Sequence, residues 1–167
     1  MNDIRYGQHF GANEWFILSA FVVGALLVLL APRRFNPKTS SVFLMCGVFF
    51  GFFFDHTLSV FPVSFYRIND TSKFETMDFI SHIIYAPVSY FFFYLYDLFH
   101  IRIRNSLLYV LAWAFASCGF ERISEAAGVF HYENGYKILY SFVIYLVVQT
   151  LWVFFYRAIM AYGDKRF

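Results

Sequence analysis

Long apolar stretches alternate with short polar segments along this chain. We expect the apolar stretches to cover residues 15–31, 41–63, 77–99, 106–127 and 138–160. Each is close to the roughly 20 residues that an α-helix needs to cross a bilayer. Only 14% of the residues are charged, against about 25% in an ordinary soluble domain. The sequence therefore predicts an all-α fold, in which residues 1–167 form one transmembrane domain built as a bundle of five spanning helices.

The distribution of basic residues predicts the orientation of these helices. The first loop, the third loop and the C-terminal end hold most of them: Arg33, Arg34, Lys38, Arg102, Arg104, Arg157, Lys165 and Arg166. Cytoplasmic loops of membrane proteins carry an excess of lysine and arginine. We therefore expect the N-terminus to lie outside the membrane and the C-terminus to lie in the cytoplasm.

Glycine and proline mark three local features. Gly47 and Gly51 form a Gly-x-x-x-Gly pair, which permits close approach of a second helix. Pro87 lies in the middle of its apolar stretch and is expected to kink that helix. Gly128 follows the fourth stretch and is expected to end it.

Ionisable residues occur inside three of the expected helices, near their outer ends. They are Asp55, His56, Asp78, His82, Glu121, Arg122 and Glu125. A charged side chain near the bilayer centre costs at least about 2.5–3.5 kcal/mol. Asp78 and His82 are spaced i,i+4 and share a helix face, whereas the adjacent Asp55 and His56 point about 100° apart. We expect one polar cluster toward the outer face.

Three interpretations of this cluster remain open. In the first, the charges only neutralise one another, with Arg122 paired to Asp55 or Glu121 and the histidines donating to carboxylates. In the second, the cluster binds or conducts a cation, a proton or a small polar molecule. In the third, it is catalytic, with a divalent metal held by ligands from a single set of candidates: Asp55, Asp78, His82 and Glu121.

Several short segments carry a resemblance to a known group of proteins. They are the Asp55 segment with the loop after it, Tyr85-Ala86-Pro87, the run from Phe120-Glu121 to Gly128-Val129-Phe130-His131-Tyr132, Gly135-Tyr136-Lys137 and Tyr140-Ser141. Together they resemble a group of small uncharacterised five-pass membrane proteins of spore-forming Firmicutes. The resemblance covers most of the chain after residue 30. It implies a multi-pass protein of a bacterial plasma membrane and implies no activity.

These features favour a non-enzymatic role, as a binding protein or as a subunit of a membrane complex. The alternatives are a small transporter or ion pathway, and an intramembrane metal-dependent hydrolase. The expected partners are the lipid bilayer and either another membrane protein or a second copy of the chain, with no nucleic acid. A divalent metal is the one cofactor that the cluster suggests.

Overall fold

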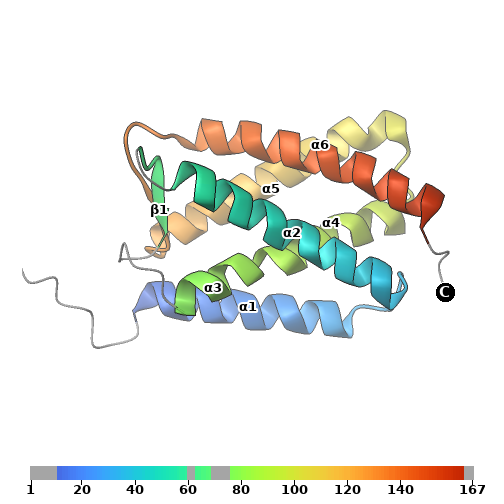
Figure 1. Ribbon diagram of the computed structural model, residues 1–167, viewed down its shortest axis with the longest axis horizontal. Coiled ribbons are helices and arrows are strands. Elements are labelled where there is room, and N and C mark those ends of the chain that lie inside the picture. Colours follow the sequence, from blue (N-terminus) through green and yellow to red (C-terminus); the bar gives the residue numbers. More distant parts are fainter. Residues whose placement is uncertain (1–10, 60–62, 69–75, 164–167) are drawn as a thin grey trace, which may run out of the picture.

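The structure is a computed structural model that describes residues 11–59, 63–68 and 76–163, without the side chains of residues 68 and 76–78. The described part is mostly helical, and its long helices lie side by side along the long axis of the molecule (Figure 1). The elements in chain order are α1 (Ala12–Leu30), α2 (Pro37–Leu58), β1 (Tyr66–Ile68), α3 (Thr76–Ile83), α4 (Tyr85–Leu98), η1 (Ile103–Asn105), α5 (Ser106–Ala126), β2 (Phe130–Tyr132) and α6 (Ile138–Tyr162).

Four helical segments are long and apolar enough to cross a membrane. They are α1, α2, the segment Phe79–Leu98 and α6. Helix α5 occupies the fourth of the predicted stretches but is not among these four. Its last two turns carry Glu121, Arg122 and Glu125, which make it less apolar than the others.

Local sequence signals explain where two of these helices begin and end. The Asn36 side chain accepts a hydrogen bond of 2.8 Å from the backbone N–H of Thr39, and Pro37 is the first helical residue. Both are favourable at a helix start, so α2 begins four residues before the predicted boundary. At the end of α5, Gly128 has φ +78°, and the N–H groups of Gly128 and Val129 donate to the Glu125 and Ser124 carbonyls. This is a Schellman motif, and it confirms Gly128 as the stop.

The predicted kink is an interruption between α3 and α4 at Ile84. Proline has no N–H, and its ring clashes with the carbonyl four residues earlier. Pro87 therefore disturbs the chain at Ile83, where α3 ends. The Pro87 ring also packs against α1, since a Cβ at Gly24 would lie 2.9 Å from its Cγ atom.

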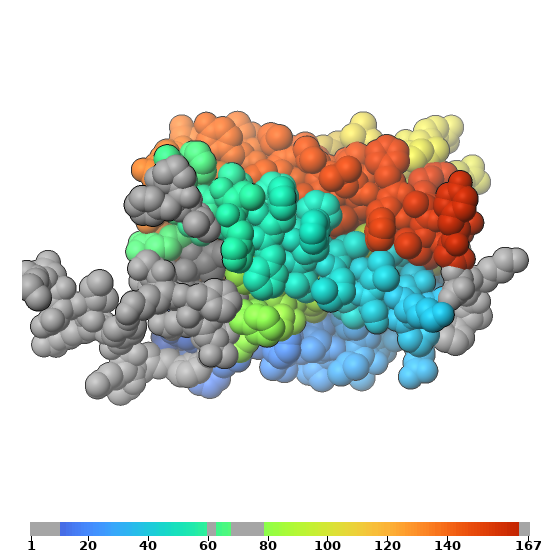
Figure 2. Space-filling model, in the orientation of Figure 1, coloured from blue at the N-terminus to red at the C-terminus, as the bar shows by residue number. Residues whose placement is uncertain are grey.

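Helices α2 and α4 cross in very close contact at the predicted glycine pair. A Cβ atom at Gly47 would lie 1.9 Å from the Tyr85 carbonyl oxygen, and one at Gly51 would lie 2.4 Å from the Tyr85 ring. The fully buried Ser89 hydroxyl accepts from the Gly47 N–H at 2.9 Å and donates to the Phe43 carbonyl at 2.7 Å. Figure 2 shows α2 crossing one face of the molecule, with α6 on one side and α1 and α3 on the other.

A two-stranded antiparallel sheet, which we call the ribbon, closes one end of the helical body. Tyr66 of β1 is paired with Tyr132 of β2, and Arg67 with His131. The ribbon lies at the opposite end of the molecule from the end of α6 (Figure 1). The prediction of an all-α fold is therefore wrong for these two loops. Their pairing depends on residues more than sixty positions apart, which no local pattern in the chain specifies.

A buried ion pair holds the other end together. The Asp97 side chain, 2% exposed, accepts a hydrogen bond of 2.5 Å from Arg34 Nε and another from the Tyr156 hydroxyl. Arg34 Nη2 also donates to the Asp97 carbonyl oxygen at 3.2 Å. The contact joins the α1–α2 loop to the end of α4 and to α6. A removed partner would leave a buried charge uncompensated, which typically costs about 3–5 kcal/mol.

We predict that Gly47→Ala destabilises the protein by about 1–3 kcal/mol, as overpacking of a close contact usually does. The new methyl group would meet the backbone of Tyr85, which cannot rotate away. Gly119→Ala is the matched control, because Gly119 lies inside α5 with nothing within 4 Å of its added Cβ, and a helical alanine gains about 0.5–1 kcal/mol over glycine. Thermal unfolding in detergent should move in opposite directions for the two variants. Equal shifts in the unfolding temperature of the two variants would mean that the α2–α4 contact has room for a methyl group.

Candidate binding site

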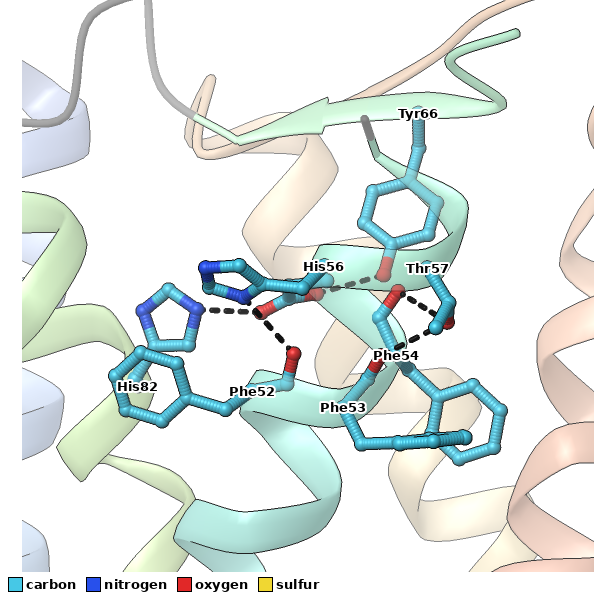
Figure 3. A network of polar contacts seen from close by, with 8 residues as sticks. Phe52, Phe53, Phe54, His56, Thr57, Tyr66 and His82 are labelled. Atoms are coloured by element: carbon cyan, nitrogen blue, oxygen red, sulfur yellow. Dashed lines mark hydrogen bonds and ion pairs between the residues drawn. The ribbon is translucent and has the colours of Figure 1, made fainter. Parts of the chain in front are cut away.

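Asp55 is buried near the end of α2, beneath the ribbon. Its Oδ1 atom accepts a hydrogen bond of 2.6 Å from the Tyr66 hydroxyl of β1. Its Oδ2 atom lies 3.1 Å from Nε2 of His82, which is also buried. Figure 3 shows Tyr66 reaching in from the ribbon while His82 approaches from α3, with its ring stacked on Phe52 at 4.1 Å. The structure thus brings together two of the predicted site residues.

Of the two other predicted residues of this group, His56 does not join Asp55, and the side chain of Asp78 cannot be placed. The His56 ring is exposed, and its Nδ1 atom lies 2.9 Å from the Phe52 carbonyl oxygen of its own helix (Figure 3). This agrees with the expectation that only one of two adjacent side chains faces the centre. The backbone of Asp78 lies in α3, and its side chain is outside what the structure describes.

Glu121 of α5 is the second buried carboxylate near the ribbon, only 5% exposed. Three hydroxyl groups donate to it. Tyr132 and Ser141 each donate to Oε1 at 2.7 Å, and Tyr145 donates to Oε2 at 2.5 Å. Hydroxyl–carboxylate distances of about 2.5–2.7 Å are typical when the acid is ionised. Glu121 is therefore surrounded by donors.

Arg122 and Glu125 lie outside this group. Arg122 Nη1 donates to Glu125 Oε2 at 2.6 Å, on the exposed side of α5, and its guanidinium lies 5.6 Å from the Tyr132 ring centre. The interpretation in which Arg122 neutralises Asp55 or Glu121 is therefore wrong. Adjacent helical residues point about 100° apart, so a buried Glu121 turns Arg122 outward, and the i,i+3 spacing then brings it to Glu125.

A cavity of about 330 Å³ lies between the helices below the ribbon. Its walls come from α2, α4, α5 and α6, with Tyr66, Phe130 and Tyr136 at the ribbon end. On α2 the lining residues run from Gly47 to Leu58, and on α6 from Ser141 to Trp152, which is about 16 Å along each helix at 1.5 Å per residue. Asp55 and Glu121 both line it. The volume falls at the lower end of the range for small-molecule sites.

Two polar atoms beside the deeper part of this cavity have no hydrogen-bond partner among the described residues. They are Oε1 of Gln149 and Nε1 of Trp152, on side chains of residues that are 2% and 6% exposed. The other end of the Gln149 amide is satisfied, because Nε2 donates to the Ser117 hydroxyl at 3.1 Å. An unsatisfied buried polar atom typically costs about 1–3 kcal/mol. Both atoms are covered by surrounding protein atoms and are not exposed to the cavity.

Three of the four predicted metal ligands, Asp55, His82 and Glu121, have side chains that the structure describes. No group of three or more histidine, cysteine, aspartate or glutamate residues that could hold a metal occurs within the described part of the chain. Asp55 and His82 form a pair, whereas Glu121 is occupied by hydroxyl donors. The geometry of these residues suits hydrogen bonding and charge recognition.

The site depends on several residues that the sequence analysis did not select. Tyrosines of the ribbon reach both acids, Ser141 and Tyr145 approach Glu121 from α6, and Gln149 faces the cavity. A signal for Gln149 was present, since it is the one amide side chain in the apolar stretch 138–160. Tyrosines are so frequent in this chain that no pattern singled out the three that bind Asp55 and Glu121.

Comparison with known proteins adds no assignment. No protein-family model, no curated protein and no solved structure matches this chain.

The ribbon tyrosines have strongly shifted acidities. Burial, followed by the charge of Asp55, raises the pKa of Tyr66 far above its ordinary value. Burial and the hydrogen bond to Glu121 likewise raise the pKa of Tyr132. The folded protein therefore holds these phenols in the neutral form that donates to the carboxylates.

We predict that Tyr66→Phe lowers the free energy of unfolding at neutral pH by about 1.5–3 kcal/mol, the usual contribution of a hydrogen bond to a charged group. The raised pKa makes this contribution depend on pH. It is complete below about pH 10, where tyrosine in the unfolded chain is neutral, and it is lost as the pH rises above that value. The stability difference between wild type and Tyr66→Phe should therefore narrow in alkali.

Unfolding of both proteins, followed from neutral to alkaline pH in detergent, measures this difference. Tyr162→Phe is the control, because Tyr162 is 93% exposed on α6. A stability difference between wild type and Tyr66→Phe that stays constant across this pH range would contradict the coupling between Tyr66 and Asp55.

Proposed function

We propose that this chain is an integral membrane protein whose five spans form a bundle, with the N-terminus outside and the C-terminus in the cytoplasm. Two features support the orientation. The α1–α2 connection, the α4–α5 connection and the C-terminal end lie at one end of the molecule (Figure 1), and these segments hold most of the basic residues. The ribbon lies at the other end. The resemblance to proteins of Firmicutes supports a bacterial plasma membrane as the location of the chain.

Cysteine probes in the α1–α2 connection test this orientation. With the two natural cysteines replaced, a probe at exposed Arg33 should react only after the membrane is opened, since basic connections stay in the cytoplasm. A probe at exposed Asn134, in the turn after β2, should react in intact cells. The reverse labelling pattern would refute the proposed orientation.

Within the membrane, the protein binds a small molecule in the cavity below the ribbon. The observation that carries this proposal is the partly open cavity of about 330 Å³, lined by apolar side chains and by a few polar groups that include Asp55 and Glu121. Convergent polar groups in an otherwise apolar pocket are typical of ligand sites.

The charge network supports binding over a purely structural role. A structural network would pair Glu121 with a basic side chain, as Asp97 is paired with Arg34 at the opposite end. Glu121 instead keeps only hydroxyl partners, on the wall of a cavity. The protein thus carries a buried acid that is solvated by hydroxyl groups but has no ion-pair partner within the described part of the chain.

Native mass spectrometry of the purified protein tests the binding site. Wild type should retain a small molecule that Ala116→Phe has lost, because Ala116 of α5 lines the cavity. Ala112→Phe is the matched control, since Ala112 lies one turn away on the same helix, is exposed and does not line the cavity. Identical occupancy in both variants, or an empty wild type, would refute a ligand site in this space.

A further inference from the structure

The geometry points to a cationic amphiphile as the occupant of this cavity: a molecule with a protonated amine at one end and a largely apolar body. We propose that its amine lies beside Glu121 at the ribbon end and that its body extends along α2 and α6. This inference rests on the proposed binding function and adds the chemical class of the ligand.

The first step concerns the charge at the ribbon end of the cavity. Asp55 and Glu121 meet there because Tyr66 and Tyr132, which bind them, are paired in the ribbon. Asp55 has the His82 ring within ion-pair distance. Among the described residues, Glu121 has only hydroxyl donors, and Arg122 is paired with Glu125 outside the cavity. Glu121 therefore presents a negative charge without a basic partner at this end, and a ligand cation would balance it.

The second step concerns the walls, which suit an organic cation. Phe50, Phe54, Trp113 and Trp152 line the cavity below the acids. Aromatic faces attract ammonium groups and also cover hydrocarbon. A divalent metal ion would instead need about six oxygen ligands, which this apolar space does not supply. A carboxylate ligand would be repelled by Glu121.

The third step concerns the deeper polar atoms. Gln149 and Trp152 are spaced i,i+3 on α6 and so face the same side. Gln149 lies two turns beyond Ser141, about 12 Å farther from the ribbon at 1.5 Å per residue. Their polar atoms Oε1 and Nε1 are covered by protein and do not reach the cavity. This part of the cavity therefore suits the apolar body of the ligand.

Three probes of equal chain length test the ligand class: octylamine, octanol and octanoate. Trp113 and Trp152 line the cavity, so tryptophan fluorescence of the wild-type protein in lipid nanodiscs reports binding. We expect octylamine to bind about tenfold more tightly than octanol, and octanoate to bind least, because of the buried charge of Glu121. Equal affinity for the amine and the alcohol would overturn the proposal without the need for any variant.

Glu121→Gln should bring the affinity for octylamine down to that for octanol. Glu125→Gln is the matched control: it removes one carboxylate of the same helix from outside the cavity, and its preference for the amine should remain. An amine preference that survives Glu121→Gln would overturn the assignment to Glu121. Thermal unfolding of each variant shows whether it folds. If Glu121→Gln does not fold, the relative affinities of the three probes for the wild-type protein decide whether the ligand is cationic.

The same titrations separate this inference from the proposed function. Octanol that binds as tightly as octylamine, and is excluded by Ala116→Phe, would keep the cavity as a ligand site and reject the cationic class. Failure of all three probes to bind to the wild-type protein would reject both the ligand site and the cationic class of its ligand.

Discussion

Two buried carboxylates control how this chain closes at one end. Asp55 on α2 and Glu121 on α5 each require donors in a place that water reaches poorly, and the donors come from a ribbon of two short strands. Burying an ion costs several kcal/mol unless hydrogen bonds compensate it, whereas each bond to a charged group returns about 1.5–3 kcal/mol. The ribbon therefore covers the acids as well as the end of the cavity.

The buried carboxylates at the two ends of the molecule have different kinds of partner. At the end opposite the ribbon, Asp97 is neutralised by Arg34 and bonded by Tyr156, in a tight aromatic core that includes Phe43 and Phe93. At the ribbon end, the helices separate around a cavity and Glu121 keeps only hydroxyl partners. The close α2–α4 contact lies at the lower edge of that cavity, which Gly47 also lines. The first end is built for stability, and the second leaves a charge available to a ligand.

The sequence predicted the helices well and the site only in part. Helical stretches depend on local composition, so four membrane-length helices, the interruption at Pro87 and the stop at Gly128 all follow from nearby residues. The direction of the Arg122 side chain and the pairing of the two ribbon strands do not follow from nearby residues. The first depends on which side of α5 is buried, and the second on the contact of two distant loops. The partners of Asp55 and Glu121 follow from that pairing, so no pattern within one segment could identify them.

The ionisation state of Glu121 decides whether the cavity is anionic. The most direct measurement is the infrared difference spectrum between wild type and Glu121→Gln at neutral pH, with Glu125→Gln as the reference for an exposed acid. Three short hydroxyl contacts predict that the substitution removes the absorption of an ionised carboxylate. Loss of the carbonyl band of a protonated acid would contradict a buried negative charge, and with it the selection of a cationic ligand.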